Sequence, residues 1–390
     1  KSHRSSRLHV WFNTPESYFK QVYNAYYLEK YQPAYTNRHQ FLTVPTGEPK
    51  DVNKPLKELA KERKLRVISD ESLLEDGFHS DHFELTVDAA KADIAWFISP
   101  LSEEYRQKVG ITDSCYVNQL PYESCLINKN FFKSTVMGNL GKSDWYKETY
   151  DLGSELPLFM ARFFENQRLG LDNHWILKPP DMVRGLDMVI TNDLQRIIRS
   201  METGPKLCQK YIENPLLLKG KKFDLRWIVM VKEAKPAQLF RYKMFWVRSA
   251  NKDFTLSPNS LEDYETHFTV MNYGGKTLQK ILDHEYVQIF DEQFADQGVQ
   301  WERDVLPKVE KMIVEIFSLA FNSFPQMDNP KCRALYGLDI MFDTDFNPYV
   351  LETNFSPDNT RCVEYDPEFF DHVFNGLFLD QDDGLIRLQQ

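Results

Sequence analysis

The chain has 390 residues, of which 42% are hydrophobic and 14% aromatic, and this apolar content excludes a largely disordered protein. Its formal net charge of −10 argues against a uniformly basic nucleic-acid binder, so we expect no nucleic-acid partner. No apolar run is long enough to cross a bilayer and no signal peptide opens the chain, so we expect no membrane partner either.

The five cysteines show no CxxC pair and no regular spacing. A sparse, odd-numbered set is typical of reduced thiols inside cells. We therefore expect a cytoplasmic protein.

Residues 1–60 are expected to form an opening segment that ends in a linker. Apolar and aromatic residues recur at helical spacing within residues 18–27, which favours a core-facing stripe over a cofactor site. The stretch "VPTGEPKDVNKP" (44–55) is rich in turn-forming residues and is typical of a linker. The main domain is expected to cover residues 61–380.

Residues 61–130 are predicted to form a small N-terminal α/β lobe. Strands are expected at "LRVIS", "ADIAWFISP" and "CYVNQLP", with helices at "DESLLEDGF" and "LSEEYRQKVG". This alternation of strand and helix indicates a parallel sheet. A further helix, "INKNFFKSTVMGNL", is expected next, with Lys129 near its start.

Residues 131–215 and 216–380 are predicted to form a central lobe and a C-terminal lobe, so the fold class is a multi-lobed α/β fold. The central lobe has strands at "HWILKP", which ends with Lys178 and a proline, and at "KLCQKYIENPLLL", after the short helix "NDLQRIIRSM". The C-terminal lobe has two long strands, "KKFDLRWIVMV" and "AQLFRYKMFWVR", joined by the turn "KEAKP". Apolar residues at helix period then predict a helix over 302–322.

The stretch 205–248 is strongly basic although the whole chain is acidic. It holds eleven lysines and arginines against three acidic residues. A local cationic face of this kind suits phosphates or an acidic polypeptide. A solvated sheet face without a ligand is the alternative that the sequence leaves open.

A hairpin near the C-terminus places oxygen-bearing side chains between hydrophobic ones. The strands "LYGLDIMF" and "PYVLETNF" are joined by "DTDFN", so Asp339 is expected opposite Glu352, with Asn354 on the same face. Two facing carboxylates repel each other unless a cation lies between them. Two carboxylates and an amide oxygen suit Mg²⁺, which keeps positions open for water and phosphate. The alternatives are a different register, or a carboxylate paired with a lysine or arginine of a neighbouring strand.

A second cluster makes the metal interpretation stronger. Lys222, Asp224 and Arg226 alternate along one strand and therefore share a face. Lysines from this strand and from "HWILKP", beside a carboxylate pair, predict a site for Mg²⁺ and ATP between two facing sheets. The run 209–212 is expected to link the lobes and to contact the adenine edge.

At these residues the chain resembles the tubulin tyrosine ligase and tubulin tyrosine ligase-like family, over roughly residues 65–380. The resemblance depends on five motifs in order: "WILKP", "QKYIENPLLLKGKKFDLR", "HFTVMNY", "YGLDIMF" and "VLETNFSPD". It implies an ATP-grasp-like fold. It also implies ATP-dependent joining of an amino acid to a carboxylate of a tubulin tail, through an acyl-phosphate that an amine attacks.

The resemblance also implies roles for individual residues. Contacts to phosphate, ribose or adenine are implied for ten side chains: Lys129, Lys178, Arg184, Gln209, Lys210, Tyr211, Ile212, Lys222, Asp224 and Thr269. Mg²⁺ ligands are implied at Asp339, Glu352 and Asn354. Arg226 and Arg248 would face the acceptor carboxylate or the acyl-phosphate.

Two motifs depart from the family pattern. Active members follow the "WILKP" strand with a glycine-rich loop, whereas "KPPDMVRGLDMVI" keeps only Gly185 and begins with two prolines that lack an N–H group. Arg184 is expected to act as a side-chain donor in its place. The family's "HLTN" pattern appears as "HFTV", so Val270 replaces an asparagine. Loss of such a hydrogen bond costs about 1–3 kcal/mol.

Three functions remain open. The first is an ATP-dependent carboxylate–amine ligase that acts on the acidic C-terminal tail of tubulin with an amino acid donor, in association with microtubules. The second is a catalytically impaired pseudo-ligase that binds tubulin or another partner and regulates the tyrosination state of tubulin. The third is an ATP-grasp enzyme acting on a small metabolite, which fits the cationic stretch 205–248 less well.

Overall fold

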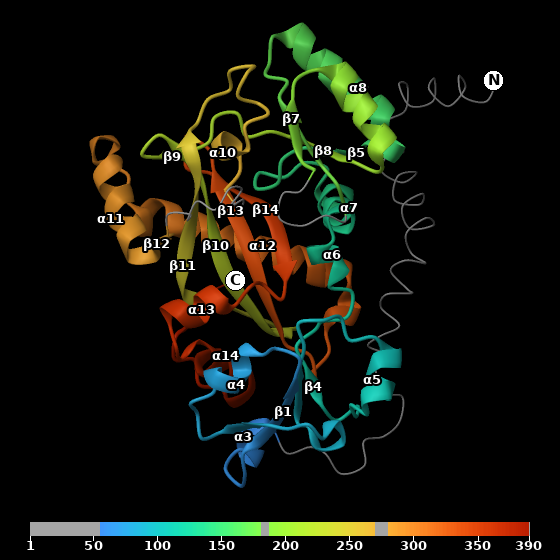
Figure 1. Cartoon of the computed structure of the whole chain (residues 1–390), viewed down its shortest axis with the longest axis vertical. Helices are drawn as coiled ribbons and strands as arrows, with labels where there is room; N and C mark the ends of the chain where they lie inside the picture. Colours follow the sequence, from blue (N-terminus) through green and yellow to red (C-terminus); the bar gives the residue numbers. More distant parts are fainter. Residues whose placement is uncertain (1–54, 181–186, 270–279, 390) are drawn as a thin grey trace, which may run out of the picture.

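The computed structural model describes residues 55–180, 187–269 and 280–389, which form an α/β fold with three separate sheets (Figure 1). The predicted opening segment therefore lies outside the described residues, except at its end. Arg184, a predicted nucleotide contact, and Val270, which replaces the asparagine of the family pattern, lie outside them as well. The lobe boundaries drawn from the sequence remain a prediction, so the three sheets are described here by their strands.

The N-terminal sheet is parallel, as the alternation of strands and helices predicted. Its order is β2-β1-β3-β4. Its strands are β1 (Leu65–Ser69), β2 (Phe83–Leu85), β3 (Ile94–Trp96) and β4 (Tyr116–Val117). The short helices around it are α3 (Leu56–Leu59), α4 (Leu73–Gly77), η2 (Ala89–Lys91) and α5 (Glu103–Val109). Ser102 caps α5 by accepting from the backbone N–H of Tyr105, and Gly110 ends it with φ of 85°.

The central sheet is antiparallel, with the order β5-β8-β6-β7. Its strands are β5 (Thr149–Asp151), β6 (Trp175–Lys178), β7 (Val189–Thr191) and β8 (Leu207–Lys210). Helices α8 (Leu152–Leu169) and α9 (Leu194–Arg199), followed by η3 (Ser200–Thr203), pack on it through a small core that includes Phe159, Trp175 and Ile197. The expected strand "KLCQKYIENPLLL" is in fact two strands, β8 and the later β9.

The C-terminal sheet is the largest of the three. Its main path is β12-β11-β10-β13-β14, with β15 added to β11 and β9 added to β10. Its strands are β9 (Leu217–Leu218), β10 (Lys221–Ala234), β11 (Ala237–Asp253), β12 (Lys280–Leu282), β13 (Ala334–Phe342), β14 (Pro348–Phe355) and β15 (Leu385–Arg387). The two long strands that the sequence predicted are β10 and β11, and they form the centre of this sheet with β13.

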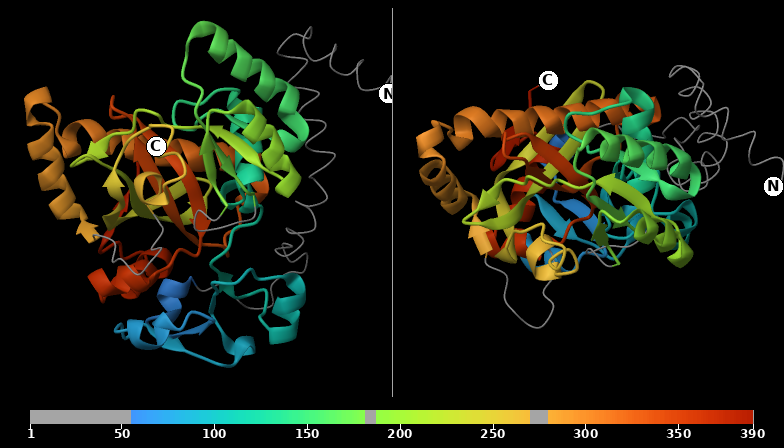
Figure 2. Two further views of the ribbon diagram at one scale, coloured as in Figure 1. Left: turned by 45° about the horizontal axis from the view of Figure 1, so that its top comes forward. Right: turned by 90° about the horizontal axis from the view of Figure 1, so that it is seen from above.

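Helices cover the C-terminal sheet on both sides (Figure 2). They are α6 (Ser124–Ile127), α7 (Lys129–Leu140), α10 (Tyr264–His267), α11 (Asp283–Gln293), α12 (Leu306–Ser323), α13 (Thr360–Tyr365) and α14 (Phe369–Leu379). Short turns of helix occur at η4 (Ala295–Gln297), η5 (Trp301–Val305) and η6 (Pro325–Met327). The helix predicted over 302–322 is thus a single wide π-turn, η5, followed by α12.

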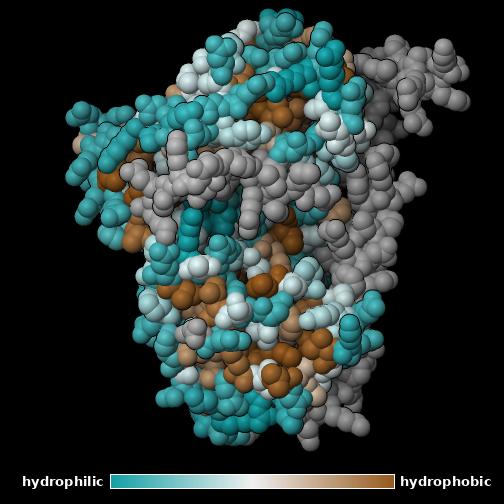
Figure 3. Space-filling view, viewed as in Figure 1, coloured by the Kyte–Doolittle hydropathy of each residue, from teal (hydrophilic) through white to brown (hydrophobic). Residues whose placement is uncertain are grey.

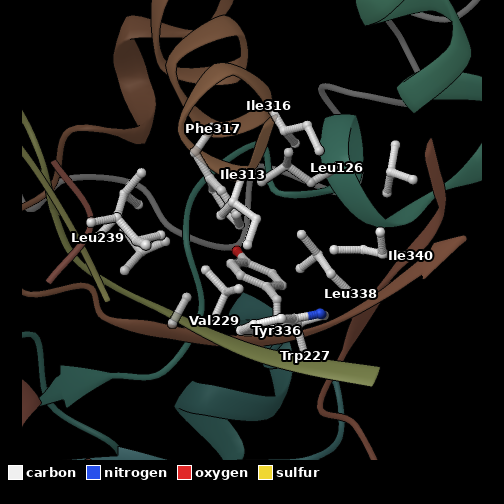
Figure 4. Close-up of a cluster of buried hydrophobic side chains, with 14 of the residues drawn as sticks. Leu126, Trp227, Val229, Leu239, Ile313, Ile316, Phe317, Tyr336, Leu338 and Ile340 are labelled. Carbon is white, nitrogen blue, oxygen red and sulfur yellow. The ribbon is translucent and has the colours of Figure 1, made fainter. Parts of the chain in front are cut away.

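One face of the C-terminal sheet is packed against α12. Figure 4 shows Tyr336 of β13 among Trp227 and Val229 of β10 and the α12 residues Ile313 and Phe317. These side chains are almost completely buried. This core fixes the orientation of β10, because every second side chain of the strand lies in it.

The opposite face of β10 is charged near the start of the strand and apolar further along it. Ile228 and Met230 pack against α14 and the N-terminal sheet, in a second core that includes Trp96 and Phe374. Figure 3 shows hydrophobic side chains gathered on this side of the molecule over those elements, while the part above is mostly hydrophilic. Towards the start of β10 the same face carries charged side chains instead, and these are the residues of the candidate site.

Two further sequence expectations bear on the environment of the protein. All five cysteines are buried and free, with no disulfide among them. Among the residues that the structure describes, no helix has both the length and the hydropathy that a membrane span requires.

Candidate functional site

The charged face of the C-terminal sheet is a row of paired residues on four adjacent strands. Asp224 of β10 pairs with Arg248 of β11, and Arg226 of β10 pairs with Asp339 of β13. Asp339 in turn pairs with Glu352 of β14, as the hairpin register predicted. Paired residues of antiparallel strands lie on the same face, so the row forms one charged surface.

Asp339 lies between two guanidinium groups. Arg226 donates to both of its carboxylate oxygens, with Nη2 3.1 Å from Oδ2, and Nη2 of Arg248 lies 2.8 Å from Oδ2. Burial alone would raise the pKa of Asp339, but Arg226 and Arg248 lower it to about 2. For this carboxylate the structure shows the alternative that the sequence left open, which was pairing with basic residues of a neighbouring strand.

Asp224 is buried beneath the row and holds two other site residues. Its Oδ1 accepts from Nε of Arg248 at 2.6 Å, and its Oδ2 accepts from the Thr269 hydroxyl. Burial raises the pKa of this carboxyl group, and Arg248 opposes that shift. Because Asp224 is 1% exposed, it positions Arg248 and Thr269, and its carboxylate is not open to a ligand.

Glu352 is the more open of the two hairpin carboxylates. Its side chain is 26% exposed, whereas that of Asp339 is 3% exposed. Its oxygens contact Nζ of Lys129 at 3.6 Å and accept from Nδ2 of Asn354 at 3.3 Å. The β13–β14 pairing shifts by one residue just after this pair, and such a bulge redirects the side chains beside it.

Two buried lysines face the site from different sheets. Nζ of Lys178, on β6, donates to Gln209 Oε1 at 2.7 Å, and Nζ of Lys222, on β10, donates to the Tyr211 hydroxyl at 2.7 Å. Burial lowers the pKa of Lys178 to about 8 and that of Lys222 to about 7. Lysines with lowered pKa values in one cluster are typical of a functional site.

The predicted adenine segment, residues 209–212, lines a small cavity between the central and C-terminal sheets. Ile176, Lys178, Lys222 and Met341 also line it. The Lys210 side chain is held elsewhere, with its ammonium 2.5 Å from Asp172 and 3.2 Å from Glu213. The structure therefore brings Lys178, Gln209, Tyr211, Ile212 and Lys222 together around one cavity, and the Lys210 ammonium is engaged by those acids.

The chain was also compared with known proteins. A family model described as the tubulin-tyrosine ligase family matches residues 112–386, which is more than half of the chain. This chain belongs to the tubulin-tyrosine ligase family. The resemblance seen in the ordered motifs is thus confirmed, and so is the α/β, ATP-grasp-like fold class.

Several members of the family are similar to most of this chain. Tubulin–tyrosine ligase-like protein 12 of Caenorhabditis elegans is 37% identical over 343 residues, which is 83% of this chain and 50% of the relative. The protein of the same name from Homo sapiens is 36% identical over 338 residues, covering 82% of this chain and 52% of the relative. A probable tubulin polyglutamylase of Mus musculus is 32% identical over 218 residues, covering 54% and 39%. The chain spans about half the length of the curated relatives named protein 12.

The site of this family member fits a magnesium-bound nucleotide in its charge and its donor types. The linked cluster contains five basic side chains (Lys129, Lys178, Lys222, Arg226, Arg248) against three carboxylates (Asp224, Asp339, Glu352). An excess of positive charge suits a phosphate chain. Glu352, Asn354 and Asp339 supply hard oxygen donors, although Asp339 can bind a metal ion only if a guanidinium contact is released. No cluster of three or more His, Cys, Asp or Glu side chains suited to a metal occurs in the described ranges.

Sequence reasoning missed one member of the site, His267. Its Nδ1 lies 3.0 Å from the Tyr211 hydroxyl, so Lys222, Tyr211 and His267 form a hydrogen-bonded chain. Burial and the nearby Lys222 lower the pKa of His267 to about 4. The signal was present, because His267 is the first residue of "HFTV", but only its neighbours were assigned a role.

Proposed function

We propose that this chain binds Mg²⁺ and ATP between its central and C-terminal sheets and acts as a carboxylate–amine ligase on the acidic tail of tubulin. The observation that carries the proposal is the pair Lys178 and Lys222. These two lysines are buried, come from different sheets and lie beside a cluster with excess positive charge. Buried ammonium groups are costly unless an anion neutralises them, and a triphosphate would do so.

The residues of the chain have distinct tasks in this proposal. Bound Mg²⁺ and ATP would supply phosphoryl transfer to the acceptor carboxylate. Lys178 and Lys222 hold the phosphates, while Glu352 and Asn354 offer oxygen ligands to the metal. Arg226, whose side chain is 12% exposed, is the guanidinium more open to an acceptor carboxylate than Arg248, which is 7% exposed.

The choice of tubulin as acceptor is supported by the relatives. One is named a probable tubulin polyglutamylase, and a tubulin glycylase of Tetrahymena thermophila is 29% identical over 233 residues. The amino acid donor is a small molecule that the site residues do not specify. The proposal includes a cytoplasmic location and association with microtubules.

A calorimetric titration of ATP tests the nucleotide site. We expect binding heat in the presence of Mg²⁺, weakened by at least about tenfold in Lys178→Met, because a charge-assisted hydrogen bond contributes about 1.5–3 kcal/mol. Lys108→Met is a matched control, because Lys108 is exposed on helix α5, beside the N-terminal sheet and outside the candidate site. Absence of Mg²⁺-dependent heat with the wild-type chain at millimolar ATP would refute the nucleotide site.

A pseudo-ligase is the second candidate, and a specific observation favours it. Asp339 is neutralised by Arg226 and Arg248, and the loop after β6 begins with Pro179 and Pro180, which cannot donate backbone hydrogen bonds. Incorporation of labelled amino acids into tubulin in the presence of ATP separates the two functions. Incorporation supports the ligase, whereas tubulin binding that persists in Asp339→Ala/Glu352→Ala without any incorporation supports the pseudo-ligase.

A further inference from the structure

A second cavity, larger than the nucleotide cavity, adjoins it. Its volume is about 940 Å³, and it lies between the end of α7, residues 141–148, α8, the first half of α12 and the start of β14. Figure 2 shows how α7, α8 and α12 approach one another in this part of the molecule. We call it the lysine groove. It shares Lys147, Lys210 and Tyr349 with the nucleotide cavity, but it contains none of the charged row around Asp339.

Basic side chains outnumber acidic ones in the lining of the lysine groove. There are six of them: Lys142, Lys147, Arg162, Lys210, Lys308 and Lys311. Three have carboxylate partners, because Arg162 pairs with Glu148 and Glu165, Lys210 with Asp172, and Lys311 with Glu315. The other three are Lys142, Lys147 and Lys308.

Lys142, Lys147 and Lys308 have no carboxylate within ion-pair distance in the part of the chain that the structure describes. The Lys147 ammonium lies 4.0 Å over the ring of Tyr349, and burial lowers the pKa of Lys147. Nζ of Lys308 donates to two backbone oxygens, those of Asp345 at 3.4 Å and Phe346 at 3.3 Å. These three ammonium groups therefore remain available to an anionic ligand.

The chemistry of the walls favours a polypeptide over a nucleic acid. Trp145 and Tyr146 are only 6% and 5% exposed, and the Tyr349 ring is occupied by Lys147, so the described residues of the lining offer no free aromatic face on which a base could stack. Three acids, Asp144, Glu148 and Glu315, interrupt the basic lining. Glu148 pairs with Arg162 and Glu315 with Lys311, so it is Asp144 that would repel a phosphate placed beside it. A peptide differs from a nucleic acid here, because its backbone N–H groups can donate hydrogen bonds to these acids.

We propose that the lysine groove binds an extended acidic segment of a partner polypeptide, whose carboxylates pair with Lys142, Lys147 and Lys308. The segment lies against α8, which packs on the central sheet, and α12, which packs on the C-terminal sheet. It is a binding site separate from the acceptor site of the proposed ligase, and it does not depend on ligase activity.

Fluorescence anisotropy with a labelled ten-residue polyglutamate peptide tests this proposal on the full chain. We expect the wild-type chain to bind the probe, with an affinity that falls as salt rises. Lys142→Glu/Lys308→Glu should weaken binding by at least about tenfold, and Lys142→Gln/Lys308→Gln by less. The matched control is Lys64→Glu/Lys108→Glu, which makes the same charge change at exposed sites of the N-terminal sheet and should stay within about twofold of the wild type.

Three results would overturn the proposal. One is an equal loss of affinity in the groove variant and the control variant, which would mean non-specific attraction. Another is loss of the peptide in Arg226→Gln while the groove variant keeps it, which would place the peptide at the row around Asp339. The third is displacement of the peptide by a ten-residue oligothymidylate of similar or higher affinity. Unchanged melting temperatures of the groove variants, the neutral one included, show that they are folded.

Discussion

Asp339 has a structural role in the sheet in addition to its predicted role as a metal ligand. The carboxylate lies among four strands and contacts Arg226 and Arg248, so it has a structural task whether or not a metal ion binds. Glu352 sits opposite it and contacts Lys129 only at 3.6 Å. Substitutions of the two acids should therefore have different consequences for stability.

We predict that Asp339→Asn lowers the free energy of unfolding by about 3 kcal/mol, because it removes the carboxylate paired with the Arg226 guanidinium and one of the two carboxylates paired with Arg248. Glu352→Gln is the control and should change it by less than about 1 kcal/mol, because its ion pair is long and partly exposed. Urea unfolding followed by circular dichroism measures both values. Similar losses in the two variants would contradict this division of tasks.

Glu123 is a half-buried acid outside the candidate site, and it should make stability depend on pH. It accepts a hydrogen bond from the Tyr336 hydroxyl at 3.1 Å, and burial raises its pKa from 4.5 to about 8. The folded state thus holds a proton that the unfolded state releases between these two values. Its contribution to stability is present below pH 4.5 and is lost as pH rises towards 8.

Glu123→Gln should remove this part of the pH dependence. Between pH 5.5 and pH 8 the wild-type chain should lose on the order of 2 kcal/mol more unfolding free energy than the variant. Urea unfolding at the two pH values measures the difference, and other titrating groups cancel in the comparison. A variant that loses as much stability as the wild type over this range would show that Glu123 does not hold the proton.

Much of the strand pairing could be predicted from the alternation of side chains between the two faces of each strand. The β10–β11 hairpin, the β13–β14 hairpin and the pairing of Asp339 with Glu352 all follow from residues of one strand facing alternate sides. The order of strands does not follow from local patterns. Because β11 is on the far side of β10 from β13, the sequence did not show that Arg248 reaches Asp339.

Contacts between elements distant in sequence also escaped prediction. The hydrogen bond from Tyr211 to His267 joins residues 56 positions apart, and the Thr269 bond to Asp224 spans 45 positions. Neither is encoded in a periodic pattern, since each depends on how α10 and its flanking residues pack over β10. Family motifs indicated that these residues matter, but only the coordinates indicate their partners.

Helix α12 is the element that holds the C-terminal sheet in place, and this can be tested. Phe317 is completely buried against Tyr336, with ring centroids 5.6 Å apart. We predict that Phe317→Ala lowers the free energy of unfolding by about 3–5 kcal/mol, through lost burial and a cavity. Phe164→Ala on α8 is the control, since Phe164 is 50% exposed, and should cost less than about 1 kcal/mol by the same urea measurement. Equal losses would contradict the role of α12.

The candidate nucleotide site depends on the central sheet and the C-terminal sheet facing each other. Lys178 belongs to β6 of the central sheet and Lys222 to β10 of the C-terminal sheet. Burial lowers the pKa of both, and the charge of Lys129 adds to the shift at Lys178 while that of Lys178 adds to the shift at Lys222. No single lobe predicted from the sequence contains this pair. The proton affinity of the two lysines is therefore a property of the assembled fold, and a ligand that binds between the sheets should change it.

We predict that binding of ATP with Mg²⁺ takes up protons near pH 7.5. In the free protein the pKa of Lys222 is about 7 and that of Lys178 about 8, so both are partly neutral at this pH. A bound triphosphate favours the charged ammonium and raises both pKa values, so protons enter on binding and affinity falls as pH rises above 8. Calorimetry in buffers of different ionisation enthalpy gives the number of protons. Lys222→Met should reduce the uptake while Lys108→Met leaves it unchanged, and proton release on binding by the wild-type chain would show that the phosphates lie away from these lysines.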